Sequence, residues 1–184
     1  MSKPRRPTRE QVAAAYGKRV PDVVAPGLDV LFCGINPGLY SGATGHHFAR
    51  PGNRFWPALH LSGFTERVLQ PYEERELLDV GLGVTNLVAR ATARADELDD
   101  AELRRGAKRL AAKVREHEPR FLAVLGLSAY RSAFGKKAAV IGLQEDAIGR
   151  TGVWVLPNPS GLNAHYQLPA LAEEFGQLRA HARA

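Results

Sequence analysis

An asparagine stands at the centre of the pentapeptide GINPG, residues 34–38, directly after the apolar run LDVLFC. Gly34 and Gly38 allow the backbone to approach another group closely, and Pro37 stiffens the middle of the turn. An asparagine amide cannot act as a general base, but in a rigid turn Asn36 could hold a water molecule or a polar ligand. The alternative is that Asn36 only satisfies its own turn, as asparagine commonly does.

A second stiff loop, PNPSGLN at residues 157–163, carries Leu162 at its apex between Ser160 and Asn163. An exposed leucine on such a loop could act as a wedge that enters a stack of nucleic-acid bases. The alternative is that Leu162 packs beneath the last helix of the chain.

An aromatic ring, Phe48, follows the first turn within a polar, glycine-containing segment. It could serve as a stacking platform for a base, although a phenylalanine in a loop more often plugs a core. The neighbouring Arg50, Asn53 and Arg54 suggest a surface that follows phosphates.

Metal and cofactor sites are not predicted. His46 and His47 are adjacent in the chain, and neighbouring residues rarely converge on one ion. GINPG departs from the dinucleotide fingerprint because proline follows the asparagine, and no Gly-Lys-Ser or Gly-Lys-Thr phosphate loop occurs.

The elements that position these residues are short apolar runs alternating with helical segments. The apolar runs cover residues 28–33, 80–88, 121–126 and 153–161, and the clearest amphipathic helix covers 99–117. This alternation predicts an α/β fold, a three-layer α/β/α sandwich with a central, mainly parallel sheet of about four to five strands. In such sheets sites lie at the carboxyl ends of strands, where the unusual residues stand.

Charge and composition favour a polyanionic partner. The 184 residues are 45% hydrophobic and carry 25 basic against 19 acidic side chains, so the formal net charge is 25 − 19 = +6. The single cysteine, Cys33, excludes a disulfide within the chain and fits a reducing compartment. No apolar run reaches the ~18 residues of a membrane span, so we expect a cytoplasmic protein without a membrane partner. Residues 1–7 are predicted to be a basic flexible arm ahead of one domain, 8–184.

Four motifs in order, GINPG, NRFW, GVTNLV and NPSGL, resemble the mismatch-specific uracil-DNA glycosylases, the Mug and thymine-DNA glycosylase branch of the uracil-DNA glycosylase superfamily. The resemblance extends from about residue 25 to residue 178 and implies that 8–184 is a glycosylase-like catalytic domain. It implies a monofunctional enzyme that hydrolyses the N-glycosidic bond of uracil, thymine or other damaged pyrimidines opposite guanine. The partners would be double-stranded DNA with G:U or G:T mismatches and the abasic product, bound by a monomer in the bacterial cytoplasm or nucleoid.

On the base side of the site, the resemblance implies that Asn36 orients the attacking water. The backbone of Ile35 and Phe48 would bind the pyrimidine edge, and the ring of Phe48 would stack on the base. Gly38 and Ser41 would also contact the flipped nucleotide. Because relatives with aspartate at the Asn36 position have a true general base, the resemblance predicts slow turnover and faster release in Asn36→Asp.

On the DNA side, the resemblance implies that Leu162 enters the gap left by the flipped nucleotide. Gly161 and Asn163 would contact the widowed guanine, and Asn158 and Ser160 would lie near the pocket or the phosphates. Asn86 follows the second strand. It is either a second catalytic residue that helps to hold the water or a cap of the strand end.

Two other functions remain open from the sequence. One is a non-catalytic module that binds mismatches or abasic sites, and the other is a uracil-DNA glycosylase of another group that acts without dependence on guanine. A nucleotide-binding metabolic enzyme is disfavoured because no phosphate loop is present.

Overall fold

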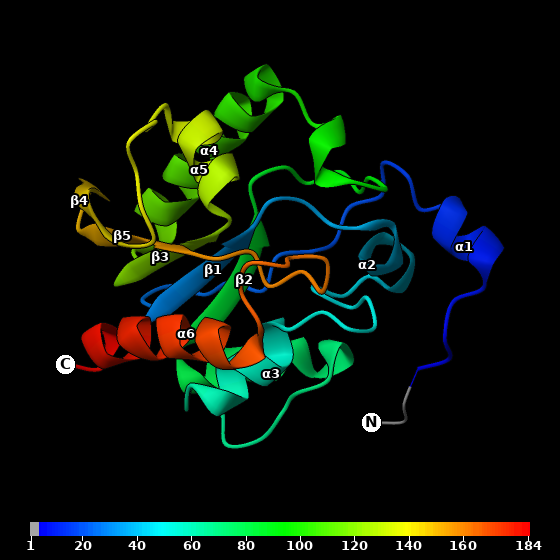
Figure 1. The fold of residues 1–184 in the computed structure, drawn as a ribbon, viewed down its shortest axis with the longest axis horizontal. Helices are drawn as coiled ribbons and strands as arrows, with labels where there is room; N and C mark the ends of the chain where they lie inside the picture. The colour runs from blue at the N-terminus through cyan, green and yellow to red at the C-terminus, as the bar shows by residue number, and fades with distance from the viewer. Residues whose placement is uncertain (1–3) are drawn as a thin grey trace.

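The computed structural model describes residues 4–184, which form a sheet of five strands between two layers of helices (Figure 1). The strands are β1 (Val30–Gly34), β2 (Leu82–Asn86), β3 (Phe121–Leu125), β4 (Gly142–Ile148) and β5 (Thr151–Leu156). Their order is β2-β1-β3-β5-β4, and only β4 pairs antiparallel to its neighbour. The predicted α/β fold with a mainly parallel sheet is confirmed.

The helices lie on both faces of this sheet. The α-helices are α1 (Arg9–Ala13), α2 (Leu39–Thr44), α3 (Phe55–Leu61), α4 (Asp100–His117), α5 (Leu127–Phe134) and α6 (Leu168–Ala182). Two 3₁₀ helices, η1 (Pro71–Val80) and η2 (Ala95–Glu97), complete the set. Figure 1 shows α4 and α5 on one side of the sheet and α3 and α6 on the other.

Alternation along β1 explains the three layers. Val30 and Phe32 belong to the core cluster that contains α3 and α6, whereas Leu31 and Cys33 belong to the cluster beneath α4 and α5. All four side chains are fully buried, because successive residues of a strand point to opposite faces and here both faces are covered. An apolar run without polar alternation therefore gives a central strand.

The turn after β1 is bonded to the segment that follows β2. Gly34 pairs with Asn86 in the parallel ladder. Beyond the ladder, Leu87 donates to the Gly34 carbonyl at 2.9 Å and Val88 to the Ile35 carbonyl at 3.0 Å. The GINPG turn is thus an extension of the sheet rather than a free loop.

Helix α2 and strand β4 were not predicted from the sequence. Helix α2 begins directly after the turn, with Gly38 as its N-cap and Gly45 as its left-handed C-cap at φ 75°. Strand β4 has mostly exposed side chains, so its sequence contains no apolar run that would predict a strand. Helix α1 begins with a capping box, in which the Thr8 and Gln11 side chains each accept from the other residue's backbone amide.

The predicted basic arm falls partly on residues 1–3, which lie outside the described residues. Residues 4–7 have no regular secondary structure and line a second cavity of about 340 Å³ together with Tyr40 and Tyr72. Within residues 4–184, no helix has the length and apolar character needed to cross a membrane.

Candidate active site

A cavity of about 420 Å³ lies at the carboxyl ends of β1, β2 and β5. It is the place where most of the residues singled out in the sequence meet. The lining residues among them are Ile35, Asn36, Gly38, Ser41, Phe48, Asn86, Asn158, Ser160 and Leu162. Gly161 and Asn163 belong to the same loop as Leu162 but do not line the cavity.

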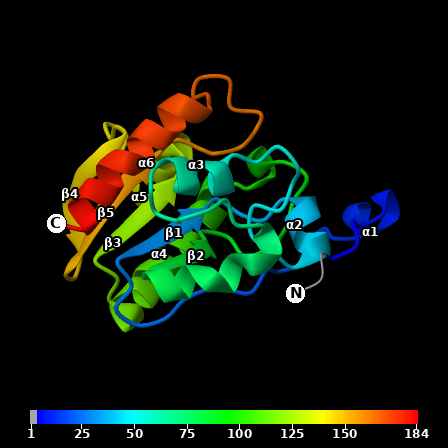
Figure 2. The ribbon, with the colours of Figure 1, turned by 90° about the horizontal axis from the view of Figure 1, so that it is seen from below.

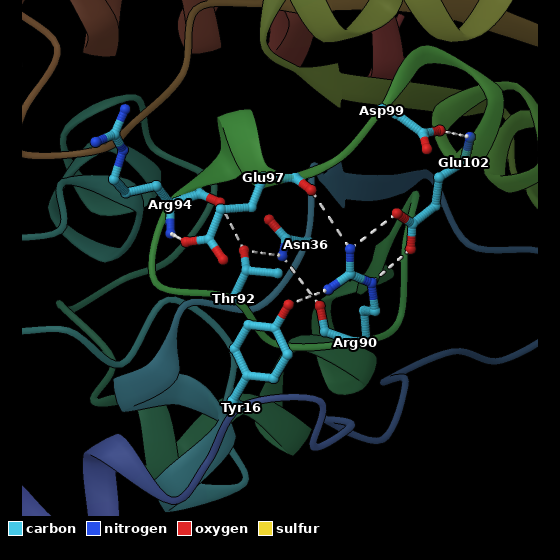
Figure 3. A network of polar contacts seen from close by, with 8 residues as sticks. All are labelled: Tyr16, Asn36, Arg90, Thr92, Arg94, Glu97, Asp99 and Glu102. Atoms are coloured by element: carbon cyan, nitrogen blue, oxygen red, sulfur yellow. Dashed lines mark hydrogen bonds and ion pairs between the residues drawn. The ribbon is translucent and has the colours of Figure 1, made fainter.

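The amide of Asn36 is held by two acceptors that come from the segment after β2. Its Nδ2 donates to the carbonyl of Arg90 at 3.0 Å and to Oγ1 of Thr92 at 2.8 Å (Figure 3). Thr92 donates its own hydroxyl proton to the Arg94 carbonyl at 2.7 Å, so its oxygen accepts from Asn36. Because both partners are acceptors, the amide nitrogen must face them, and Oδ1 is turned away from them. That oxygen is available to accept a hydrogen bond in the cavity.

The carbonyl of Arg90 is itself fixed by its side chain. The guanidinium donates to Glu102 in α4 from Nε at 2.6 Å and from Nη2 at 2.9 Å. A further bond from Nη1 reaches the hydroxyl of Tyr16 at 3.1 Å, and Figure 3 shows these groups around Arg90. A bidentate carboxylate pair of this kind restrains the arginine strongly, so the frame behind Asn36 is anchored to the body of the domain.

Asn86 is oriented by a histidine that the sequence analysis left without a role. The ring of His47 bonds through Nε2 to the Pro21 carbonyl at 2.8 Å, and a carbonyl only accepts, so Nε2 carries the proton. Nδ1 of His47 is then an acceptor, and Nδ2 of Asn86 lies 3.3 Å from it. The carbonyl oxygen of Asn86 is therefore turned from His47. In both Asn36 and Asn86 the amide nitrogen is held, and within residues 4–184 no group donates a hydrogen bond to the side-chain oxygen.

His47 is buried, and burial lowers the pKa of its ring below the usual value, although nearby Glu74 acts in the opposite direction. The neutral ring fits the tautomer that its contacts require. Glu74 fixes the backbone here, because its carboxylate accepts from the His47 amide at 2.8 Å and lies 2.9 Å from Nδ1 of His46. Within the described residues, no cluster of three or more histidine, cysteine, aspartate or glutamate side chains could hold a metal ion.

Phe48 has an uncommon backbone conformation. Its φ is +50°, a left-handed value that is costly for a bulky side chain and that occurs most often at functional sites. The ring stacks on Phe55 with centroids 4.1 Å apart. Ser41 supports the same segment, because its Oγ accepts from the Ala49 amide at 3.1 Å. The half-buried ring therefore packs against the core cluster that contains α3 and α6 and also lines the cavity.

The two glycines of the turn differ in what they allow. A Cβ at Gly34 would lie 2.6 Å from Oδ1 of Asn86 and 3.3 Å from the Phe48 ring, so a side chain there would displace the Asn86 amide. A Cβ at Gly38 would meet no atom within 4 Å. The close approach predicted for both glycines is found at Gly34, and Gly38 instead starts α2.

The loop after β5 ends in an exposed leucine. Leu162 has 77% of its surface exposed, so it does not pack beneath the last helix. Figure 2 shows this loop, in orange between β5 and α6, projecting from the body of the domain. Asn163 donates from Nδ2 to the Asn158 carbonyl at 2.9 Å, and its Oδ1 accepts from the His165 amide. Both polar groups of the Asn163 side chain therefore bond within the loop in this structure.

Two residues predicted to follow phosphates are engaged elsewhere. Oδ1 of Asn53 accepts from the Phe55 amide two residues on, at 3.0 Å, in the turn that leads into α3. The guanidinium of Arg54 bonds to carbonyls of the loop that carries Leu162. Of the three polar neighbours of Phe48, only Arg50 is exposed.

The cavity brings together Asn36, the ring of Phe48 and the exposed Leu162, three residues to which the motif resemblance gives roles. The family model described as the uracil DNA glycosylase superfamily matches residues 21–180, which is most of the chain. The chain belongs to the uracil DNA glycosylase superfamily. Members of this superfamily are DNA glycosylases, so the substrate is DNA and the bond that is hydrolysed is the N-glycosyl bond of uracil.

Within this superfamily fold, Thr92 and His47 support the site but were not predicted from the sequence to do so. Both act through another residue: Thr92 holds the amide of Asn36 and His47 faces the amide of Asn86. No local pattern could reveal Thr92, since it lies 56 positions from Asn36. For His47, the adjacent Phe48 was a signal that this segment lines the site.

Proposed function

We propose that this glycosylase removes uracil opposite guanine in double-stranded DNA by flipping the nucleotide into the cavity, leaving an abasic site. The observation that carries this proposal is that two features lie at one cavity. The amide nitrogen of Asn36 is held by two hydrogen bonds, and Leu162 is exposed on a stiff loop. The first suits hydrolysis, and the second suits filling the gap in a duplex. Thymine and other damaged pyrimidines are further candidate substrates.

The chemistry follows from what an amide can do. Oδ1 of Asn36 accepts one hydrogen bond from a water molecule and so directs an oxygen lone pair of that water at C1′ of the sugar. The bond between C1′ and N1 of the pyrimidine breaks, and its electron pair leaves with the base. The water oxygen bonds to C1′ and its proton passes to solvent or to the departing base.

The barrier is lowered by positioning and by stabilising charge, because no general base contacts the water in this scheme. The backbone of Ile35 and Phe48 binds the pyrimidine edge, and the ring of Phe48 covers its face. Uracil leaves readily as an anion, so a positioned water without a general base is enough for hydrolysis. Asn86, with its oxygen unclaimed, either shares the water with Asn36 or contacts the base.

Guanine preference is assigned to the loop that carries Leu162. A flipped base costs a few kcal/mol to unpair and unstack, and this cost is lowest at a mismatch. Leu162 fills the space that the nucleotide leaves, while Gly161 and Asn163 face the widowed guanine. Asn158 and Ser160 line the cavity at the base of the same loop.

Single-turnover release of base from matched duplexes tests this proposal. The substrates carry G·U, A·U and G·T pairs, and a single strand carries uracil alone. We expect the fastest release from G·U and at least about tenfold slower release from A·U, since a base pair that must be broken raises the cost of flipping. Equal rates on G·U, A·U and single-stranded uracil would contradict dependence on guanine. Binding to the mismatch without any release would favour the non-catalytic module.

A further inference from the structure

Arg54 makes four hydrogen bonds to the segment that carries Leu162. Its backbone amide donates to the Pro159 carbonyl at 2.9 Å. Its guanidinium donates from Nη1 to the carbonyls of Asn163 at 3.1 Å and Tyr166 at 2.6 Å, and from Nη2 to that of Gly161 at 3.1 Å. One side chain therefore spans the loop on both sides of its apex.

The contacts require the shape of arginine rather than its charge alone. A guanidinium is planar and presents several donors in a fixed fork, whereas a lysine ammonium is a point with rotating donors. Within residues 4–184, no carboxylate lies within 4.0 Å of the Arg54 guanidinium, so backbone carbonyls are its partners.

A second contact holds the same loop close to the segment that precedes α3. A Cβ at Gly161 would lie 2.8 Å from the carbonyl of Gly52, so the two backbones touch directly. Inside the loop, Ser160 accepts from the Leu162 amide at 3.2 Å and from the Asn163 amide at 3.0 Å. Leu162 itself has little to pack against, and so the order of the apex depends on these polar contacts.

We propose that Arg54 is the positioning residue of the wedge: it holds loop 157–166 in the form that projects Leu162 before DNA is bound. Ordering the loop in the free protein removes an entropic cost from binding, and so raises affinity for DNA with a gap in its stack. The role given to Leu162 rests on the proposed function, whereas the ordering of the loop by Arg54 does not.

Arg54→Lys tests the inference because it keeps the charge and removes the fork. Arg131→Lys is the matched control: Arg131 also donates to a backbone carbonyl, that of Ala139 from Nε at 2.9 Å and from Nη2 at 2.7 Å, and it does not line the cavity. The first readout is amide hydrogen exchange in the protein without DNA. We expect the Leu162 and Asn163 amides to exchange at least about tenfold faster in Arg54→Lys and unchanged in Arg131→Lys.

The second readout is affinity for a duplex that contains an abasic site opposite guanine. We expect Arg54→Lys and Leu162→Ala each to raise Kd about tenfold, and the double variant to stay within about twofold of Leu162→Ala, because both changes remove the same wedge. A residue that merely contacts phosphate through its charge would leave Kd unchanged in Arg54→Lys.

Three results would overturn the inference: unchanged exchange in Arg54→Lys, unchanged Kd, or losses that add fully in the double variant. If the wild-type protein released no uracil from any substrate, the proposed function would fail, while the exchange measurement would still decide whether Arg54 orders the loop.

Discussion

The two regions that meet at the cavity are built in opposite ways. The turn that carries Asn36 continues the central sheet, and the Asn36 side chain donates hydrogen bonds to Arg90 and Thr92. The loop that carries Leu162 leaves the sheet, exposes its apex and is held by polar contacts, chiefly those of Arg54, the N-cap residue of α3. One region is fixed by the core, and the other is fixed by polar contacts at the surface.

This difference separates two tasks. Positioning a water for attack requires a group held to within a fraction of an ångström, which a sheet end supplies. Filling a gap in a DNA stack requires an apolar side chain that stands clear of the protein, which a core cannot supply. The comparison predicts that substitutions in the turn affect chemistry and substitutions in the loop affect capture.

The largest expected effect is that of Asn36→Ala. Removing the oxygen that positions the water should lower the single-turnover rate of uracil release by about 10²–10³-fold, the loss typical for one preorganised polar group. Affinity for abasic DNA should stay within about twofold, because the loop is untouched. A rate within about tenfold of wild type would transfer the role to Asn86, and Asn86→Ala is the variant to measure next.

Asn36→Asp separates the sequence-based expectation from that of the structure. The motif resemblance predicts faster release, since aspartate is a true base. The contacts predict slower release, by about tenfold or more at pH 7, because a carboxylate oxygen would face the Arg90 carbonyl and the Thr92 oxygen where the amide now donates. Release faster than wild type would show that the contacts with Arg90 and Thr92 rearrange, and would contradict their role in fixing residue 36.

Thr92→Val should lower the release rate by about tenfold. The substitution keeps the shape of the side chain but removes the acceptor that fixes the amide of Asn36. Thr92→Ser restores the hydroxyl and should recover most of the rate, with the KM for duplex substrate unchanged in both variants. Equal rates for the valine and serine variants would exclude the hydroxyl from the positioning of Asn36.

Leu162→Ala should act on capture rather than on chemistry. We expect about tenfold weaker binding to abasic duplex, as the wedge loses most of its apolar surface, and a fall of less than about fivefold in the release rate at saturating protein. Retention of wild-type affinity would remove Leu162 from the interface.

The smallest expected effect concerns His47 and acid stability. Because burial lowers the pKa of His47 in the folded protein, the unfolded chain takes up a proton first as pH falls below about 6.5, and the folded state loses stability. Glutamine does not take up a proton in this pH range, so His47→Gln removes this loss of stability. The drop in Tm between pH 8 and pH 5 should therefore be smaller in His47→Gln by about 2–4 °C, and an equal drop in both proteins would contradict a buried neutral ring.

The strands β1, β2, β3 and β5 and the residues at their ends were predictable because apolar runs and rigid turns are local signals, whereas the mostly exposed β4 has no such signal. The sheet, the position of Asn36 and the exposed Leu162 follow from such signals. The contacts that hold Asn36 and the loop were not predictable, since Thr92 and Arg54 meet their partners only in the folded chain. For Arg54, the basic neighbourhood suggested phosphate contact, and tertiary structure directed the guanidinium to carbonyls instead.

The most direct test of the separation between chemistry and capture measures two quantities for two variants on one set of duplexes. Asn36→Ala and Leu162→Ala are compared for single-turnover uracil release from a G·U duplex at saturating protein and for affinity toward the matching abasic duplex. We expect Asn36→Ala to lose the rate of uracil release and keep its affinity for abasic DNA, and Leu162→Ala mainly to lose that affinity. Comparable losses of both quantities in both variants would contradict it.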